Sequence, residues 1–249
     1  MEIFKDFFTW DISGETWASL IVMVIIVVLY IIIGIIAKHH DPLKPSKGLL
    51  WLGETLVNFF DRLVDELMGP RFKGFGGIVL GIASYLFIAF IFGLTGLPSP
   101  VTNLATPLSF AFLTFFMIHG TSIRYTKWKY FKRYIEPVPL FLPMNLISMW
   151  APVLSLSLRL FGNAISGWVI MTIIYSFLES VFSGLSIVIQ GTVFSPLSAV
   201  VTPLLHAYFD LFSGFIQTTV FIFLTMLYVA REAPEDEIEE NSIRRGGEE

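Results

Sequence analysis

A single arginine interrupts a long apolar stretch of the chain. Arg159 is the only Lys or Arg between Glu136 and Arg231, and it lies in the run Leu154–Asn163, which has the composition of a membrane-buried helix. Placing an arginine at the centre of a bilayer costs at least roughly 2.5 to 3.5 kcal/mol, so such residues are rare and usually serve an ion or substrate pathway. Arg159 is therefore the first candidate functional residue.

Polar and small residues recur at helical spacing around Arg159. Ser155, Arg159 and Asn163 share one face of a helix. Gly162 and Ser166 form a pair of small residues at the spacing that lets membrane helices pack closely. We therefore expect Arg159 to face a partner helix rather than lipid.

A second polar stripe lies in the last apolar segment, at steps of three or four residues: His206, Asp210, Ser213, Gly214 and Gln217. These positions share one face of a straight helix. The stripe is about 16 Å long at 1.5 Å per residue, roughly half the thickness of the hydrocarbon core. It predicts the lining of a half-channel that ends near the middle of the membrane. The alternative is that the same residues form hydrogen bonds between helices.

The composition explains why these polar residues stand out. The 249 residues are 55% hydrophobic and 14% charged, with a mean hydropathy of +0.73. Such values indicate an integral membrane protein, and the length suffices for about five spans of roughly 20 residues each, with no sizeable soluble domain. Cysteine is absent, which excludes disulfides and thiolate metal sites. We expect no metal and no cofactor.

The apolar segments predict an all-α fold with one membrane domain over residues 1–230. Its spans are expected near residues 17–37, 77–97, 107–123, 140–182 and 203–230. The first span is expected to be retained, because the segment before it lacks the positive charge of a signal peptide. The last two are expected to be long and tilted, and Pro143 and Pro152 offer kink points in the fourth.

Residues 48–68 predict an amphipathic helix at the membrane interface. Its apolar stripe comprises Leu49, Leu52, Leu56, Phe59, Phe60, Leu63, Val64 and Leu67, opposite the polar residues Glu54, Asn58, Asp61, Asp65 and Glu66. Such a helix lies in the membrane surface with its apolar side inward. The alternative is packing against another protein domain.

Loop charges predict the orientation. The connections after the first and third spans contain Lys38, Lys44, Lys47, Arg124, Lys127, Lys129, Lys132 and Arg133, whereas residues 98–106 and 183–202 contain no Lys or Arg. The positive-inside rule places the N-terminus outside and the C-terminus in the cytoplasm. The acidic tail, residues 231–249, is expected to be a solvated cytoplasmic extension.

Three motifs resemble one known family. They are LSLRLFGN at Leu156–Asn163, LPMNLI at Leu142–Ile147 and FDLFSGFIQ at Phe209–Gln217. Together with the order of spans, they resemble the a subunit of rotary F-type ATP synthases, of the bacterial type. The resemblance implies a proton-conducting stator beside a ring of c subunits, held by the b subunits of the peripheral stalk in a bacterial plasma membrane. Other subunits would carry out the nucleotide chemistry.

The resemblance also implies roles for individual residues. A carboxylate on the ring can face lipid only when it is neutral, and a nearby cation favours release of its proton beside the stator. Arginine stays charged, so Arg159 would act as an electrostatic gate between two half-channels. Gln217 would orient Arg159, and Asn163 would hydrogen-bond nearby. Asp210 matches a position that is usually ionisable in the family, and His206 lies one turn further out as a second relay residue.

The sequence departs from the family at two places. Trp168 stands where many relatives have Glu, so the external relay would depend on Asp210 and His206, with water, Ser166 or Tyr175. Glu179 is expected at the external mouth, with snorkelling to the surface as an equal alternative. Acids that often follow the Pro-x-Asn motif are replaced by Ser148 and Met149. The remaining internal candidates are Asn145, Ser148, Ser155 and His119, which are as well explained by structural roles.

Two other classes of protein share some of these features with a rotary stator. A secondary transporter would also use a charged site near the midplane, but it typically shows internal repeats, and this chain has none that we can identify. A membrane-embedded enzyme would need a nucleophile, a metal cluster or a pair of acids. His206 and Asp210 alone do not supply a metal cluster or a pair of acids.

Overall fold

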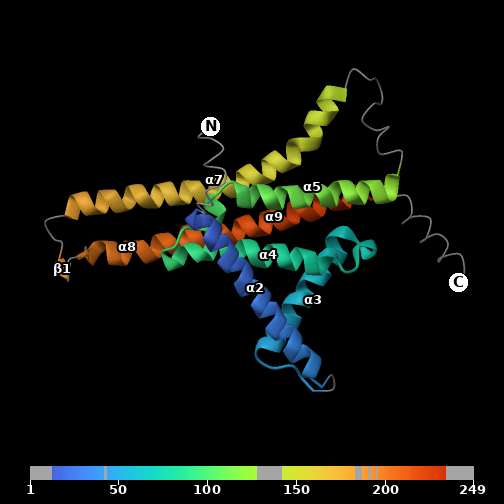
Figure 1. Ribbon diagram of the computed structural model, residues 1–249, viewed down its shortest axis with the longest axis horizontal. Coiled ribbons are helices and arrows are strands. Elements are labelled where there is room, and N and C mark those ends of the chain that lie inside the picture. Colours follow the sequence, from blue (N-terminus) through green and yellow to red (C-terminus); the bar gives the residue numbers. More distant parts are fainter. Residues whose placement is uncertain are drawn as a thin grey trace, which may run out of the picture.

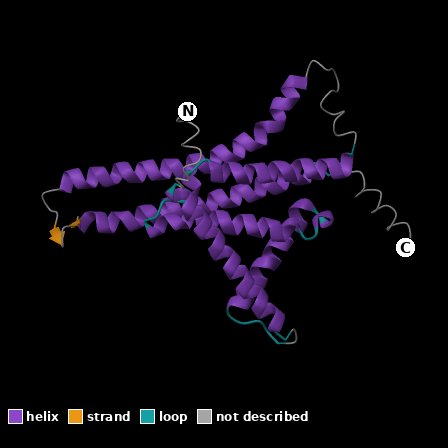
Figure 2. Ribbon diagram, in the orientation of Figure 1, coloured by secondary structure: helices purple, strands orange, loops and turns teal. Residues whose placement is uncertain are grey.

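The computed structural model describes residues 13–41, 44–127, 142–182, 187–189, 192–194 and 196–233. Helices dominate this part of the chain, as Figure 2 shows. Five of them are long and apolar enough to cross a membrane. The predicted fold class, an all-α integral membrane protein with about five spans, is confirmed.

The spans follow one another in chain order. The first four contain α2 (Gly14–His39), α4 (Phe75–Ile91), α5 (Ala105–Thr126) and α7 (Leu142–Phe182). The fifth runs through α8 (Pro196–His206), the π-helical turn η6 (Ala207–Phe212) and α9 (Ser213–Ala230). Three short 3-10 turns, η1 (Pro70–Phe72), η2 (Phe92–Thr95) and η3 (Pro100–Thr102), lie in the connections. Helices are favoured because a membrane offers no water to satisfy the backbone.

The central bundle is formed by α4, α5, α9 and part of α7, which run side by side in Figure 1, while α2 crosses them obliquely. Leu86 of α4, Leu160 of α7, and Phe221 and Met226 of α9 are fully buried in its core. Hydroxyl groups join the helices at Ser19–Tyr85, Tyr30–Ser84 and Thr114–Thr225. Polar pairs of this kind fix the rotation of one membrane helix against another.

The amphipathic segment forms α3 (Leu49–Met68), which ends at Gly69 with a φ of 83°. Its second half buries Phe60 and Val64 against the chain's own bundle, including α4 and α9. Its first half contacts α2, with Leu50 buried, but leaves Trp51 and Leu52 exposed. The helix thus packs on this chain along one face and presents apolar side chains on another, and its place in the membrane interface stays a prediction.

The fourth span is a single helix of 41 residues with Pro152 inside it. It changes direction along its length and its first part diverges from α5 (Figure 1). Proline has no N–H to donate within a helix, which permits such a bend. Residues 128–141, including the first two residues of the predicted span, lie outside the part of the chain that the structure describes.

Two features of the fold were not predicted. Between α7 and α8, β1 (Ile187–Ile189) pairs antiparallel with β2 (Thr192–Phe194), and Val188 lies opposite Val193. The second feature is η6, which interrupts the last span at Asp210. A π-helical turn holds one more residue than an α-helical turn, so the polar residues before and after it do not share the straight face that their spacing predicted.

The contacts of the last span show how the polar stripe divides. Ser213 faces α7, where its hydroxyl donates to Asn163. Gly214 faces α4, because a Cβ added at this glycine would lie 2.6 Å from Cβ of Phe90. Only glycine lets the two backbones approach this closely. Packing of α4 on α9 therefore depends on residue 214.

We predict that Gly214→Ala destabilises the protein by about 1 to 3 kcal/mol, the usual cost of overpacking a core. The measurement is the free energy of unfolding in detergent. Gly120→Ala in α5 is the matched control, because a Cβ there meets nothing within 4 Å. Alanine at position 120 should be neutral or slightly stabilising, by up to about 1 kcal/mol. Equal effects at the two positions would contradict the packing argument.

Candidate functional site

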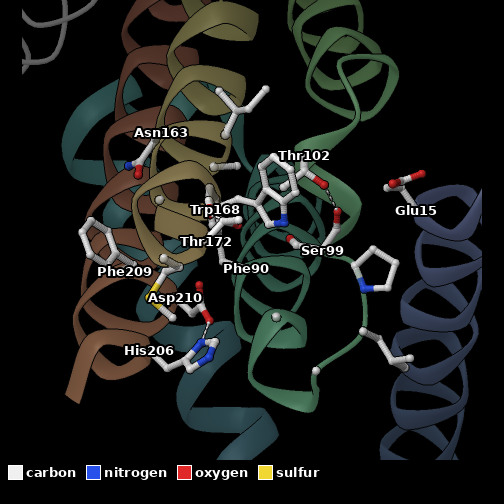
Figure 3. Close-up of a pocket in the computed structure, with 18 of the residues that line it drawn as sticks. Glu15, Phe90, Ser99, Thr102, Asn163, Trp168, Thr172, His206, Phe209 and Asp210 are labelled. Carbon is white, nitrogen blue, oxygen red and sulfur yellow. Dashed lines mark hydrogen bonds and ion pairs between the residues drawn. The ribbon is translucent and has the colours of Figure 1, made fainter. Parts of the chain in front are cut away.

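The main polar cavity lies between α7, the η6 turn, the η2–η3 connection and the start of α2. It has a volume of about 690 Å³, and Figure 3 shows the side chains that line it. Its polar and ionisable lining residues are Glu15, Ser99, Thr102, Asn163, Thr172, Tyr175, His206 and Asp210. The cavity therefore unites polar groups that are widely separated in the sequence.

A chain of hydrogen bonds crosses one wall of the cavity. Nδ1 of His206 lies 2.5 Å from Oδ2 of Asp210, one helical turn away. The hydroxyl of Tyr175 in α7 lies 2.8 Å from Nε2 of His206. All three side chains are only partly buried. An imidazole bonded through both nitrogens can accept a proton on one side and release one on the other.

The position of Asp210 depends on the glycine opposite it. A Cβ added at Gly93 in η2 would lie 3.1 Å from Oδ2 of Asp210. Any larger side chain at residue 93 would crowd the carboxylate. The η6 turn and η2 thus hold Asp210 at the cavity wall from two directions.

The polar lining includes Asn163 of α7, whose side chain also joins the last span. The hydroxyl of Ser213 donates to Oδ1 of Asn163 over 2.8 Å. Arg159 lies four residues earlier in α7, which is about 6 Å along a helix. The cavity lining and Arg159 are therefore separated by about one helical turn.

Arg159 lies on an exposed, mostly apolar face of α7. Leu154 and Leu158 on this face are 56% and 55% exposed, whereas Leu156 and Leu160 point into the core. Nη2 of Arg159 donates to Oγ of Ser155 over 3.3 Å. No carboxylate in the described part of the chain forms an ion pair with this guanidinium. A counter-charge, if Arg159 meets one, would come from outside these residues.

Gln217 forms no hydrogen bond with Arg159 within the part of the chain that the structure describes. Its side chain is only 6% exposed, and its Nε2 has no hydrogen-bond partner there. The arginine instead uses Ser155 of its own helix. An orienting role for Gln217 would require one of the two side chains to change rotamer.

The weaker candidates separate into two groups. Tyr175 lines the cavity, whereas Ser166 does not. Ser166 is exposed and donates to the carbonyl of Asn163. Ser148 donates to the carbonyl of Met144, and the ring of His119 packs against Phe115 with centroids 4.0 Å apart. Asn145, Ser148, Ser155 and His119 do not line this cavity. The side chain of Glu179 lies outside the described residues.

The structure adds lining residues that sequence analysis did not select. Glu15 comes from the start of α2, Ser99 and Thr102 from the connection between α4 and α5, and Thr172 from α7. Trp168 also lines the cavity and is 60% exposed. A lack of Lys and Arg in residues 98–106 was the one sequence signal that pointed to this region.

Comparison with known proteins decides the family. Residues 18–230 match the family described as ATP synthase A chain. The chain belongs to this family.

Relatives from several bacteria agree. ATP synthase subunit a of Mycoplasma genitalium is 31% identical over 225 residues, covering 85% of this chain and 76% of the relative. The Bacillus subtilis protein of the same name is 26% identical over 232 residues, covering 88% and 92%. A sodium-ion-specific subunit a of Propionigenium modestum is 31% identical over 193 residues, covering 71% and 60%.

Family membership confirms the resemblance drawn from the three motifs. The chain is a non-catalytic membrane subunit of a proton-translocating ATP synthase complex, and it is embedded by several spans. The transporter alternative loses its support. Among the residues that the structure describes, no three His, Asp or Glu side chains are grouped as metal ligands require.

We predict that the cavity admits water from one side of the membrane. The chain has no cysteine, so single substitutions can be labelled without background. Thr172→Cys should react with a charged, membrane-impermeant thiol reagent added on one side only, because a thiolate forms in water and not in lipid.

Ile173→Cys is the matched control, since Ile173 is 62% exposed but does not line the cavity. It should react at least about tenfold more slowly, because a thiol facing hydrocarbon stays protonated. Equal labelling of both positions, or no labelling of Thr172→Cys, would contradict an aqueous cavity.

Proposed function

We propose that this chain is the stator against which an ATP synthase ring rotates, with Arg159 as the electrostatic gate between two offset half-channels. The observation that carries the proposal is the state of Arg159. It is an exposed guanidinium on an apolar helix face, with a serine as its hydrogen-bond partner and no carboxylate of the described chain beside it.

The gate follows from the free energy of charges in a membrane. A ring carboxylate that faces lipid must be protonated, because an unpaired ion in hydrocarbon is too costly. Beside a guanidinium within about 4 to 6 Å, the pKa of a carboxyl group is typically lowered by roughly 1 to 3 units. The proton is therefore released where Arg159 and the ring carboxylate meet. Arginine itself keeps its proton, which prevents a direct leak between the half-channels.

The external half-channel is assigned to the cavity. Protons would pass from its mouth to Tyr175, His206 and Asp210, and then towards Asn163 and Arg159. Support comes from the continuous contacts of Tyr175 with His206 and of His206 with Asp210. Trp168 has no titratable group, so the relay acid would lie on the last span instead of α7.

The cytoplasmic half-channel is assigned to the other side of Arg159. Ser155 is bonded to the guanidinium, and Ser148 and Asn145 lie further towards the start of α7. His119 approaches from α5 within an aromatic cluster that includes Trp150. These residues are proposed to guide protons away from the ring, and Gln217 is proposed to orient Arg159 once the ring is in place.

Partners and orientation complete the proposal. The exposed apolar faces of α7 and α9 around Arg159 would meet the ring of c subunits, and b subunits would hold the stator. Loop charges support an external N-terminus and a cytoplasmic C-terminus in a bacterial plasma membrane. The helix α3 would then lie on the cytoplasmic interface, and Glu179 near the external mouth.

We predict that Arg159→Lys lowers proton-driven ATP synthesis by at least about tenfold, although it keeps a nominal positive charge. A desolvated lysine can lose its proton and cannot match the planar fork of a guanidinium. The measurement is ATP synthesis by the whole complex in proteoliposomes. Leu158→Ile, a conservative change at the adjacent exposed position, should retain synthesis. Normal ATP synthesis by Arg159→Lys would contradict the role of Arg159 as the gate.

We predict that Asp210→Asn slows proton flow by at least about tenfold without preventing assembly, because positioned proton-transfer groups contribute on the order of a hundredfold. Passive proton uptake into vesicles measures the flow, and the recovered amount of intact complex measures assembly. Asp210→Glu keeps a titratable group and should retain much of the proton flow that Asp210→Asn loses. Unchanged flow in Asp210→Asn would exclude this residue from the relay.

A further inference from the structure

A second carboxylate borders the cavity, far from the relay in the sequence. Glu15 lies in the first turn of α2 and lines the same cavity as Asp210. Its side chain is partly buried. The start of α2 packs directly on a lining residue, since a Cβ added at Gly14 would lie 3.3 Å from Cγ of Pro98. The packing of α2 thus holds Glu15 beside the cavity.

The wall next to Glu15 is formed by the connection between α4 and α5. Figure 3 shows Glu15 projecting from α2 into the space beside Ser99 and Thr102, with His206 and Asp210 on another wall. Among the residues that line the cavity, Glu15 and Asp210 are the carboxylates, and none is Lys or Arg. The negative charge of Glu15 is therefore not cancelled by a lysine or arginine in the lining.

The hydroxyl groups of the wall present acceptors to the cavity. Ser99 donates its proton to the carbonyl of Ala89 over 2.8 Å, and Thr102 donates to the carbonyl of Ser99 over 2.7 Å. On α7, Thr172 donates to the carbonyl of Trp168 over 2.9 Å. A hydroxyl has one proton and two lone pairs, so each oxygen can then only accept from the cavity. Such a surface favours hydronium over anions.

We propose that Glu15 is the proton-collecting carboxylate at the outer mouth of the external half-channel. It takes a proton from hydronium, leaving water, and passes that proton through water in the cavity to the His206–Asp210 pair. The carboxylate is thereby regenerated for the next proton. A negative charge at the mouth of a narrow, low-dielectric opening raises the local concentration of cations. This inference rests on the external half-channel of the proposed function.

A simpler role for Glu15 must be separated by experiment. An acid in the first turn of a helix is stabilised by the helix dipole wherever the helix lies. That role explains an acid at the start of α2, but it does not require the acid to line a cavity with the relay. The two roles differ in their dependence on the external proton concentration.

The experiment uses Glu15→Gln in the assembled complex in proteoliposomes. ATP synthesis is measured at weak buffering while the pH is varied on the side that faces the cavity mouth. Loss of a proton collector should raise the proton concentration for half-maximal synthesis by roughly two- to fivefold, less than the roughly tenfold or larger effect of a full set of steering charges. The maximal rate should stay unchanged. Concentrated mobile buffer, which delivers protons directly, should restore the wild-type curve.

Three variants serve as controls. Glu54→Gln removes the same charge from α3 and should leave the curve unchanged. Thr16→Ala removes a hydroxyl of the same first turn of α2, where it contacts Ser13, and it should also leave the curve unchanged. Glu15→Asp keeps the carboxylate, so its dependence of ATP synthesis on pH should stay close to that of the wild type.

Two results would overturn the inference. One is a Glu15→Gln curve that coincides with that of the wild type. The other is a lower maximal rate at every pH, shared with Thr16→Ala, which would indicate a role in helix stability alone. Asp210→Asn separates this inference from the proposed function. If Asp210→Asn slows proton flow while Glu15→Gln has no effect, only the collecting role of Glu15 is contradicted. Normal proton flow in Asp210→Asn would contradict the assignment of the external half-channel itself.

Discussion

The high free energy of a charge in hydrocarbon is the constraint on which the rest of the structure depends. Arg159 occupies an apolar helix at a cost of at least roughly 2.5 to 3.5 kcal/mol, and the described part of its own chain supplies a hydroxyl and no carboxylate. The neighbouring residues Leu156 and Leu160 anchor the opposite face of α7 in the core. The guanidinium is therefore held towards the outside of the subunit.

The same constraint explains how the cavity is built. Polar groups gather where α2, α7 and the last span meet the connection between α4 and α5, and they satisfy one another or line open space. Close approach requires glycine at two positions: Gly93 leaves room for the carboxylate of Asp210, and Gly214 lets α9 pack against Phe90. The polar site and the tight packing beside it thus depend on the absence of side chains as much as on their presence.

Much of the fold could be predicted because long apolar runs are compatible with few structures other than membrane-spanning helices. Composition and length indicated a helical membrane protein, and the three motifs indicated the family. The spacing of His206 and Asp210 placed them one turn apart, and the structure brings them into contact. The cavity as a whole could not be predicted, because Glu15, Ser99 and Tyr175 meet only through tertiary packing. No proline or glycine within Ala207–Phe212 indicates the π-helical turn. The β1–β2 pair was missed, although β-branched residues on either side of Gly191 are typical of a hairpin.

The π-helical turn has a consequence for how the last span can vary. Its surplus residue separates α8, which contains His206, from α9, whose face contacts the core through Phe221. A rotation of one of these two helices can be absorbed at the turn instead of passing along the whole span. The polar groups before the turn and the helix packing after it can therefore change independently, although one continuous backbone carries both.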